Sequence, residues 1–170
     1  MLRLFLLTVL FCSIDFLRAA TPYKDCGSTA GTIQSFEVTG CTTAPCKFAK
    51  GNNYTMNLAF QAKSASKSLS VSIHGVIGGI PVPFPLPDPD ACKMQVKCPV
   101  NANDVNTAVM TLPVLSSYPS LSLYVKLELK ADDTGNDYTC LQFPATIVSG
   151  LAQERTLVGW KKGKLFEMLD

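Results

Sequence analysis

Apolar and polar residues alternate strictly over residues 121–130, which is the feature that most restricts how this chain can fold. Alternation with a period of two places one set of side chains on each face of a β-strand. The inward set is expected to be Leu121, Leu123, Val125, Leu127 and Leu129. Similar patterns occur at residues 32–39, 46–49, 53–61, 68–76, 108–115 and 138–148, with Gly, Pro, Asn and Asp between them. Since there is no convincing helical stripe, the pattern predicts an all-β, immunoglobulin-like sandwich of about seven antiparallel strands.

A second feature is the series of prolines at every second position over residues 81–89. Proline cannot donate to a strand ladder and its φ angle is fixed, so we expect a stiff, extended surface segment that does not pair as a strand. Alternate side chains then share an edge, which places Val82, Phe84 and Leu86 together. A rigid arm that holds a phenylalanine beside an apolar sheet suits the mouth of a pocket. An ordinary proline-rich linker fits less well, because Cys92 and Cys98 tether the segment nearby.

Length and composition indicate one domain with an excess of apolar side chains. The chain has 170 residues, of which 47% are hydrophobic and only 16% charged. Such a surplus must enter a packed core, a cavity for an apolar ligand or a membrane. Residues 1–20 resemble a secretory signal peptide, since the apolar run after Arg3 is too short to span a bilayer; a retained anchor is the alternative. Residues 21–150 form the expected domain, and residues 151–170 an atypical tail, expected to be disordered, with Trp160 beside three lysines.

Charge excludes one class of partner. Residues 21–150 contain nine lysines, no arginine and nine acidic residues, so their formal net charge is zero. No basic face for nucleic acid is therefore expected.

The cysteines indicate an exported, disulfide-bonded domain. Of seven, Cys12 lies in the signal segment, and an even set of six behind a signal sequence is typical of three disulfides. Fifteen connectivities are possible in principle. The obvious local bridges are Cys41–Cys46 and Cys92–Cys98, which leaves Cys26 with Cys140. A zinc site is a weak alternative, because the spacings are wrong and His74 is the only histidine.

No motif marks a catalytic centre. The sequence lacks a nucleophile elbow, a zinc-protease motif and a phosphate-binding loop, so an enzyme is not expected. His74 lies between apolar residues of a predicted strand, which favours a hydrogen-bonded structural role over that of a general base. Asn53 begins the only glycosylation sequon, Asn-Tyr-Thr, and its use would place that strand start at the surface.

Several short motifs carry a family resemblance. The chain is similar to the Niemann–Pick type C2 family of secreted sterol carriers, within the ML lipid-recognition domain family. The matching segments are Lys24-Asp25-Cys26-Gly27-Ser28, Pro45-Cys46, Lys50-Gly51, His74-Gly75, Pro81-Val82-Pro83-Phe84-Pro85, Cys98-Pro99, Leu112-Pro113-Val114 and Tyr118-Pro119-Ser120. The resemblance covers nearly the whole of residues 21–150 and implies a seven-stranded sandwich with the same three bridges.

The resemblance also implies a function and a site. In that family cholesterol enters tail first between the two sheets, with no cofactor and no metal. Residues matching Phe84, Val114 and Tyr118 gate the tunnel, and Pro119 supports its rim. Four positions match lining residues, namely Tyr54, Phe48, Leu121 and Leu123. Ile80 matches a surface position used to hand sterol to a membrane transporter. Core packing is the competing interpretation for each, and the weakest one for Phe84, because flanking prolines restrict its reach.

The same resemblance implies partners and a location. We expect a monomer that is secreted and reaches the lumen of endosomes and lysosomes, where it meets their membranes and the sterol transporter of the Niemann–Pick type C system. Leu127 and Leu141 replace tryptophans of the vertebrate proteins, so the pocket and the preferred lipid are expected to differ. Two alternatives stay open: carriage of a fatty acid or semiochemical, and presentation of a bound lipid to an immune receptor.

Overall fold

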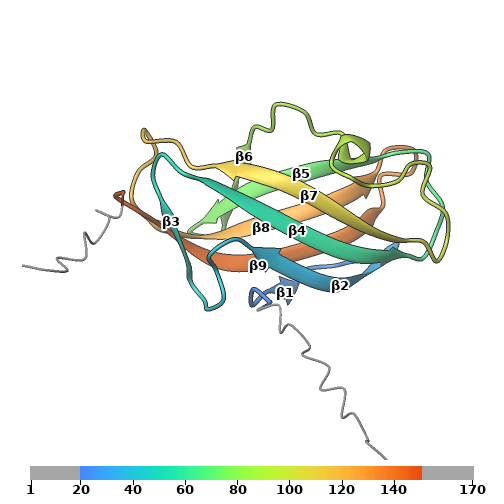
Figure 1. Cartoon of the computed structure of the whole chain (residues 1–170), viewed down its shortest axis with the longest axis horizontal. Coiled ribbons are helices and arrows are strands. Elements are labelled where there is room, and N and C mark those ends of the chain that lie inside the picture. The colour runs from blue at the N-terminus through green and yellow to red at the C-terminus, as the bar shows by residue number, and fades with distance from the viewer. Residues whose placement is uncertain (1–19, 151–170) are drawn as a thin grey trace, which may run out of the picture.

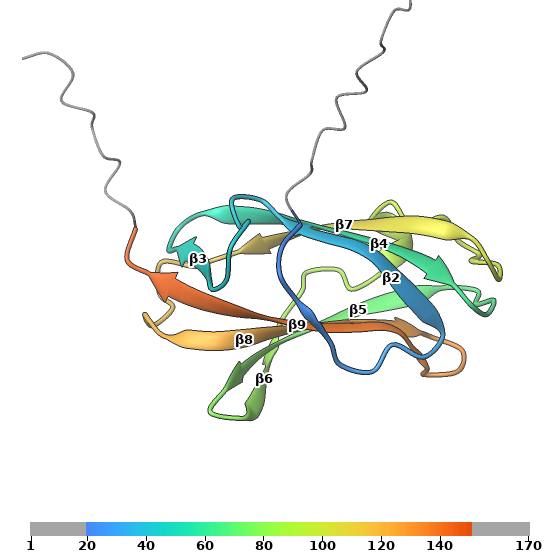
Figure 2. The same cartoon turned by 90° about the horizontal axis from the view of Figure 1, so that it is seen from below.

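Two sheets face each other in the structure, a computed structural model that describes residues 20–150 (Figures 1 and 2). The expected signal segment and C-terminal tail lie outside the described residues. The elements are β1 (Lys24–Asp25), β2 (Gly31–Val38), β3 (Cys46–Ala49), β4 (Asn53–Ala62), β5 (Leu69–Ile77), β6 (Ile80–Phe84), a single 3-10 turn η1 (Ala91–Lys93), β7 (Val105–Pro113), β8 (Ser122–Ala131) and β9 (Asp137–Val148).

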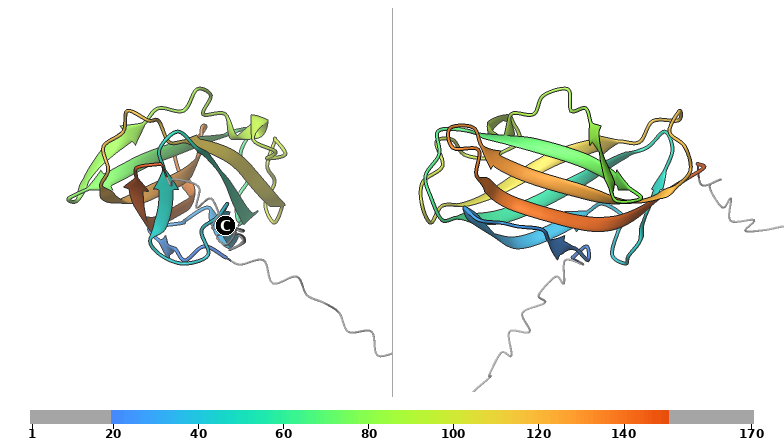
Figure 3. Two further views of the ribbon diagram at one scale, coloured as in Figure 1. Left: turned by 60° about the vertical axis from the view of Figure 1, so that its left-hand side comes forward. Right: turned by 180° about the vertical axis from the view of Figure 1, so that it is seen from behind.

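The strand order confirms the all-β sandwich. One sheet has six strands in the order β1-β9-β8-β5-β6, with β3 added beside β9, and the other has three in the order β2-β4-β7. All seven expected strands are present, and β1 and β6 are additional. Among the described pairings β3 with β9 is parallel, whereas the others are antiparallel. Figure 3 shows the sandwich obliquely from one end on the left and from behind on the right.

The prediction that the proline segment does not pair as a strand is wrong for its first part. Residues Ile80–Phe84 form β6 and pair antiparallel with β5, His74 opposite Pro83 and Val76 opposite Pro81. Backbone N–H groups alternate between the two sides of a strand, so prolines at alternate positions remove donors from one side only. Ile80, Val82 and Phe84 keep theirs for β5, which is possible because β6 is an edge strand.

The core lies between the sheets and is made of the inward set of each strand. On β4 the alternation is complete, with Met56, Leu58, Phe60 and Ala62 all buried. The rings of Phe36 and Phe143 meet across the layer, with centroids 5.2 Å apart. The inward positions predicted on β8 are confirmed, since Val125, Leu127 and Leu129 are buried and Leu123 packs against the core.

Three disulfides fasten the sandwich and confirm the predicted pairing. They join Cys26 to Cys140, Cys41 to Cys46 and Cys92 to Cys98. The first spans 114 residues and ties β1 to β9. The other two close short loops beside β3 and η1.

Candidate functional site

An aromatic pair lies where the proline segment meets the core. Phe84, the last residue of β6, and Tyr118, in the connection between β7 and β8, meet edge-on with ring centroids 6.4 Å apart. Both side chains are half-buried and pack against buried core residues. Edge-to-face rings at this distance attract each other weakly, by about 0.5–1.5 kcal/mol, so little free energy is needed to separate them. The structure thus brings together two of the three residues predicted to gate the interior.

A second aromatic pair lies at the end of the sandwich where β7 ends. Phe48 of β3 and Tyr54 of β4 have ring centroids 4.5 Å apart, and the Tyr54 hydroxyl accepts a 2.7 Å hydrogen bond from the Ala49 N–H. Val114, directly after β7, is buried, and its backbone exchanges hydrogen bonds with Gly51 and Asn52. Three predicted site residues, Phe48, Tyr54 and Val114, therefore lie on or beside the same short stretch of chain.

The other predicted site residues differ in their burial. Leu123 faces inward and packs against the core. Leu121 precedes β8, is half-buried, and its carbonyl accepts from the Ile147 N–H at 2.9 Å. Pro119 is exposed beside Tyr118, a place that suits a rim.

Two further half-buried side chains, in the connection between β6 and β7, were not among the predicted site residues. Leu86 and Met94 are half-buried and pack against the core from the connection between β6 and β7. Met94 is fastened to β7, because its carbonyl accepts from the Val109 N–H at 2.8 Å. Leu86 was predicted to share the apolar edge of Val82 and Phe84 but was not named as a site residue. Nothing in the spacing of Met94 distinguishes it.

The β5–β6 hairpin projects from the six-stranded sheet (Figure 2) and carries exposed apolar side chains. This hairpin surface consists of Ile77, Ile80 and Val82, of which Ile80 is 68% exposed. Tyr124, on β8 opposite Val76, is also exposed but lies on the other face of the sheet. Ile80 is thus placed where another surface could contact it. Val82 shares one face of β6 with Phe84, as their alternate positions predict, but it is 47% exposed whereas Phe84 is half-buried. β6 is the edge strand of its sheet and pairs with β5 alone. No second layer therefore covers Val82.

A groove of about 420 Å³ lies beside the hairpin surface, lined by Pro45, Val76, Gly78, Gly79, Ser122, Leu123, Tyr124, Pro144, Ala145 and Thr146. Ser122 pairs with Thr146 and Tyr124 with Pro144, and the hydroxyls of Ser122 and Thr146 are 3.1 Å apart. These residues alternate with the inward Leu123 and Ala145. Most of the groove therefore belongs to the outer face of the six-stranded sheet and not to the interior between the sheets.

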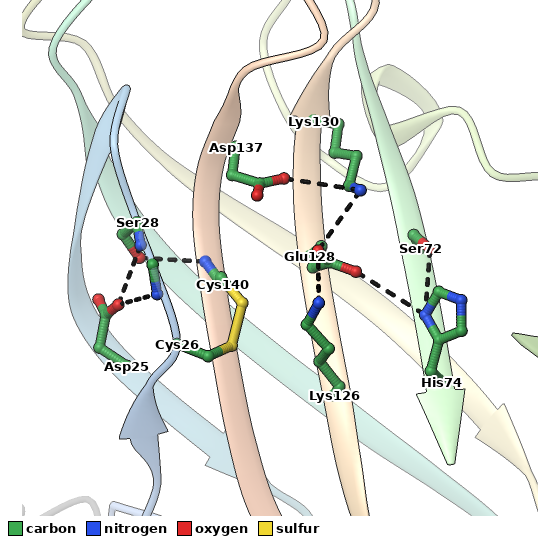
Figure 4. The surroundings of a disulfide bond; sticks show 11 residues. Asp25, Cys26, Ser28, Ser72, His74, Lys126, Glu128, Lys130, Asp137 and Cys140 are labelled. Carbon is green, nitrogen blue, oxygen red and sulfur yellow. Dashed lines mark hydrogen bonds and ion pairs between the residues drawn. A yellow bond between two sulfur atoms is a disulfide. The ribbon is translucent and has the colours of Figure 1, made fainter. Parts of the chain in front are cut away.

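A charged cluster covers the middle of the same outer face (Figure 4). Glu128 is 3% exposed; its carboxylate accepts from Lys126 Nζ at 2.9 Å and lies 3.4 Å from Lys130 Nζ. Burial raises the pKa of Glu128, but the hydrogen bond from Lys126 and the two lysine charges outweigh it, so the net pKa lies below its usual value. His74 Nδ1 lies 3.7 Å from this carboxylate and 3.5 Å from Ser72 Oγ. The cluster is a satisfied network, which is consistent with the structural role predicted for His74.

Within residues 20–150 no group of three or more His, Cys, Asp or Glu side chains is arranged to hold a metal ion. No helix in this part of the chain is long and apolar enough to cross a membrane. Asn53, the sequon residue, is exposed at the start of β4, although glycosylation itself stays a prediction. What the structure offers is an apolar interior with an aromatic edge, a chemistry suited to binding and not to bond making.

Comparison with known families gives one match over most of the chain. The family model described as "ML domain" matches residues 20–147. This range spans every strand of the sandwich except the last residue of β9.

Individual proteins agree with that match. The chain is 36% identical to "NPC intracellular cholesterol transporter 2" of Bos taurus, over 86% of this chain and 99% of that one. It is 37% identical to the protein of the same name from Mus musculus, over 87% and 100%. It is 41% identical to "Ecdysteroid-regulated 16 kDa protein" of Manduca sexta, over 74% and 87%. Among solved structures, a Niemann-Pick type C2 protein from the Japanese carpenter ant superposes with a TM-score of 0.71 at 28% identity, covering 75% of this chain and 99% of that chain.

Proposed function

Because this chain belongs to the ML domain family, whose members are non-enzymatic lipid-binding proteins, we propose that it carries a sterol between its two sheets. The observation that carries the proposal is the half-buried Phe84–Tyr118 pair at the edge of a predominantly apolar core. The chain matches relatives named as cholesterol transporters over most of their length, and this match supports the choice of ligand. The disulfides and these relatives point to the secretory pathway.

Entry requires the two rings to separate. Phe84 lies on β6, which is held by β5 on one side only, and Tyr118 lies in a connection without regular structure. Both elements can move by a few ångströms without breaking the central β5-β8-β9 pairing. Val114 completes the gate with Phe84 and Tyr118, and Pro119 supports the rim. Phe48, Tyr54, Leu121 and Leu123 contact the ligand from the two sheets.

Burial of apolar surface supplies the affinity. Covering about 500 Å² of a sterol at about 25 cal/mol/Å² contributes roughly 12 kcal/mol. Lost translation and rotation and the ordering of the rings oppose this by about 4 kcal/mol or more. The balance corresponds to micromolar to nanomolar binding. The sterol hydroxyl at the entrance stays in water and needs no buried partner.

Delivery uses the hairpin surface. Ile80 at its tip contacts the receiving membrane or the membrane sterol transporter of the Niemann–Pick type C system, and the lumen of endosomes and lysosomes is the place where both are present. Asn53 lies at the start of β4, in the other sheet, so a glycan attached to it leaves this surface free.

The test is a titration of delipidated protein with a fluorescent sterol, followed by displacement with cholesterol or palmitate. We expect saturable binding that cholesterol displaces, and at least a tenfold weaker affinity in Phe84→Ala. Val105→Ala is the matched control, because Val105 is an apolar strand residue that is 68% exposed away from the site. Thermal denaturation establishes that both variants are folded. Absence of sterol binding, displacement by palmitate alone, or an unchanged affinity in Phe84→Ala contradicts the proposal.

A further inference from the structure

The groove on the outer face of the six-stranded sheet is not used by the proposed function. It has a volume of about 420 Å³, and most of its lining alternates along the strands with the side chains that face the interior. Its floor consists of Ser122 and Tyr124 on β8 and of their partners on β9, Thr146 and Pro144. Its margins are the turn between β5 and β6 and the proline that precedes β3.

The Tyr124 ring is an unused apolar surface in this groove. The side chain is 53% exposed, and within residues 20–150 it has neither a ring contact nor a hydrogen bond. Pro144 lies opposite it on one side and Val76 on the other, which completes an apolar row across the sheet. The face of an aromatic ring carries a partial negative charge, which attracts the C–H groups of a ligand. A flat ring with C–H groups on its face, such as that of a sugar, fits this surface.

Two hydroxyl groups lie beside this row. Ser122 Oγ and Thr146 Oγ1 are 3.1 Å apart, so one of them donates to the other. A hydroxyl group has one donor and two acceptor positions, so the pair can still both donate and accept. A ligand rich in hydroxyls can bond with the pair while its ring covers the neighbouring tyrosine. A hydrocarbon chain would cover the same hydroxyls without bonding to them, which is unfavourable.

The margin of the groove is positively charged. Lys47 on β3 is exposed opposite Thr146, and no ion pair engages it in the described part of the chain. Lys126 follows Tyr124 on the same face of β8, roughly 7 Å further along the strand. Among the described residues no Asp or Glu lines the groove, and the next carboxylate on β8, that of Glu128, is buried and bonded to Lys126 (Figure 4). A ligand with negative groups is therefore complementary to this face.

Two other kinds of partner fit the groove less well. A peptide that adds a strand needs a free sheet edge, whereas the floor strands β8 and β9 have neighbours on both sides. A membrane is contacted by projecting apolar side chains, and those of the hairpin surface, Ile77, Ile80 and Val82, lie on the other face of the sheet.

We propose that the outer groove binds an acidic saccharide chain, one whose sugars carry sulfate or carboxylate groups. A sugar ring lies on Tyr124, and its hydroxyls bond with Ser122 and Thr146. The negative groups pair with Lys47 and Lys126. This site is separate from the sterol interior, so the two activities can be tested independently.

The test is a calorimetric titration of the full chain with a heparin hexasaccharide, which carries both sulfate and carboxylate groups. Maltohexaose, a neutral saccharide, and hexaglutamate, an acidic peptide, are the comparison ligands. We expect saturable binding of the heparin fragment and at least about tenfold weaker binding of the other two, because each offers only the ring or only the charge.

Variants assign the binding to the groove. Tyr124→Ala should weaken it about fivefold or more, because the stacking surface is lost, whereas Tyr124→Phe keeps the ring and should retain most of the affinity. Lys47→Gln should weaken it and reduce its dependence on salt. Lys97→Gln, which changes an exposed lysine in the connection before β7, is the matched control and should leave the affinity unchanged.

The variants are decisive because Lys161, Lys162 and Lys164 in the C-terminal tail also attract sulfate groups. Weaker binding of the heparin fragment in Tyr124→Ala, with sterol binding unchanged, supports the inference. It is overturned by an absence of saturable binding, by equal affinities of wild type and Tyr124→Ala, or by equal affinities for the fragment and either comparison ligand. None of these results affects sterol carriage. Failure of the wild type to bind sterol contradicts the proposed function alone.

Discussion

Gly75 leaves the space that Leu123 occupies: a Cβ atom added at residue 75 would lie 2.9 Å from Leu123 Cδ1. The two residues face the interior from the adjacent strands β5 and β8. A side chain at residue 75 would therefore compete with a predicted lining residue for the same volume.

We expect Gly75→Ala to cost only about 1 kcal/mol of unfolding free energy, because the end of a leucine side chain can rotate away. Gly31→Ala provides the contrast. Its Cβ would lie 2.8 Å from the Tyr138 carbonyl oxygen and 3.2 Å from that of Gln61, and backbone in two strands cannot yield so easily. We expect a loss of about 3 kcal/mol there. Urea denaturation measures both, and equal losses would contradict the distinction.

The second prediction concerns pH. The pKa of Glu128 is lower in the folded than in the unfolded protein, so the carboxylate stabilises the fold above its unfolded pKa of about 4.3, and this contribution disappears as the pH falls through the lowered folded value. Glu128→Gln should cost about 1–2 kcal/mol at pH 7, a modest figure because the lysines are partly exposed. The difference from wild type should shrink in acid.

Asp88→Asn is the matched control for Glu128→Gln. Asp88 also pairs with a lysine, at 2.7 Å from Lys93 Nζ, but this pair is at the surface, where solvent screens it. Thermal unfolding between pH 3 and pH 7 measures both variants. A difference between Glu128→Gln and wild type that stays constant over this range would contradict the assignment.

The third prediction concerns the disulfides. In the loop-entropy model the bridge over 114 residues is worth about 5 kcal/mol, whereas the bridge over six residues is worth about 2 kcal/mol. Replacing both Cys26 and Cys140 by alanine should therefore destabilise the fold much more than the same change at Cys92 and Cys98. Guanidinium denaturation of the two double variants checks the order, and the reverse order would show that native-state contacts dominate.

The fourth prediction isolates one hydroxyl at the second aromatic pair. Tyr54→Phe keeps the ring against Phe48 but leaves the buried Ala49 N–H without its acceptor, which should cost about 1–2 kcal/mol. Tyr124→Phe is the control, since Tyr124 is 53% exposed, and it should lie within about 0.5 kcal/mol of wild type. Similar losses in the two variants would mean that the Tyr54 hydroxyl contributes nothing specific.

The fold was largely predictable because its signal is local. Alternation along a strand needs only neighbouring residues, and β4 and β8 follow it over most of their length. The pairing of β6 was not predictable in the same way, since it depends on which side of the strand lies at a sheet edge. The proline spacing alone permits both outcomes.

The site was predictable only in part, because burial is set by residues distant in sequence. Glu128 lies on the outward face as its position in the alternation requires, yet Lys126, Lys130 and neighbouring strands bury it. Tyr138 is buried against Phe60 although strict alternation along β9 would turn it outward, because a register shift between Leu129 and Lys130 interrupts the pairing there. Such a shift requires knowledge of both strands.

Alternate prolines on β6 also disfavour self-association through the edge of the sheet. The side of this strand that faces away from β5 lacks the N–H groups of Pro81 and Pro83, so an incoming strand finds no regular series of donors to pair with. An edge strand that exposes Ile80 and Val82 would otherwise be prone to edge-to-edge aggregation. The prolines let this apolar edge stay exposed without offering a template for further strands.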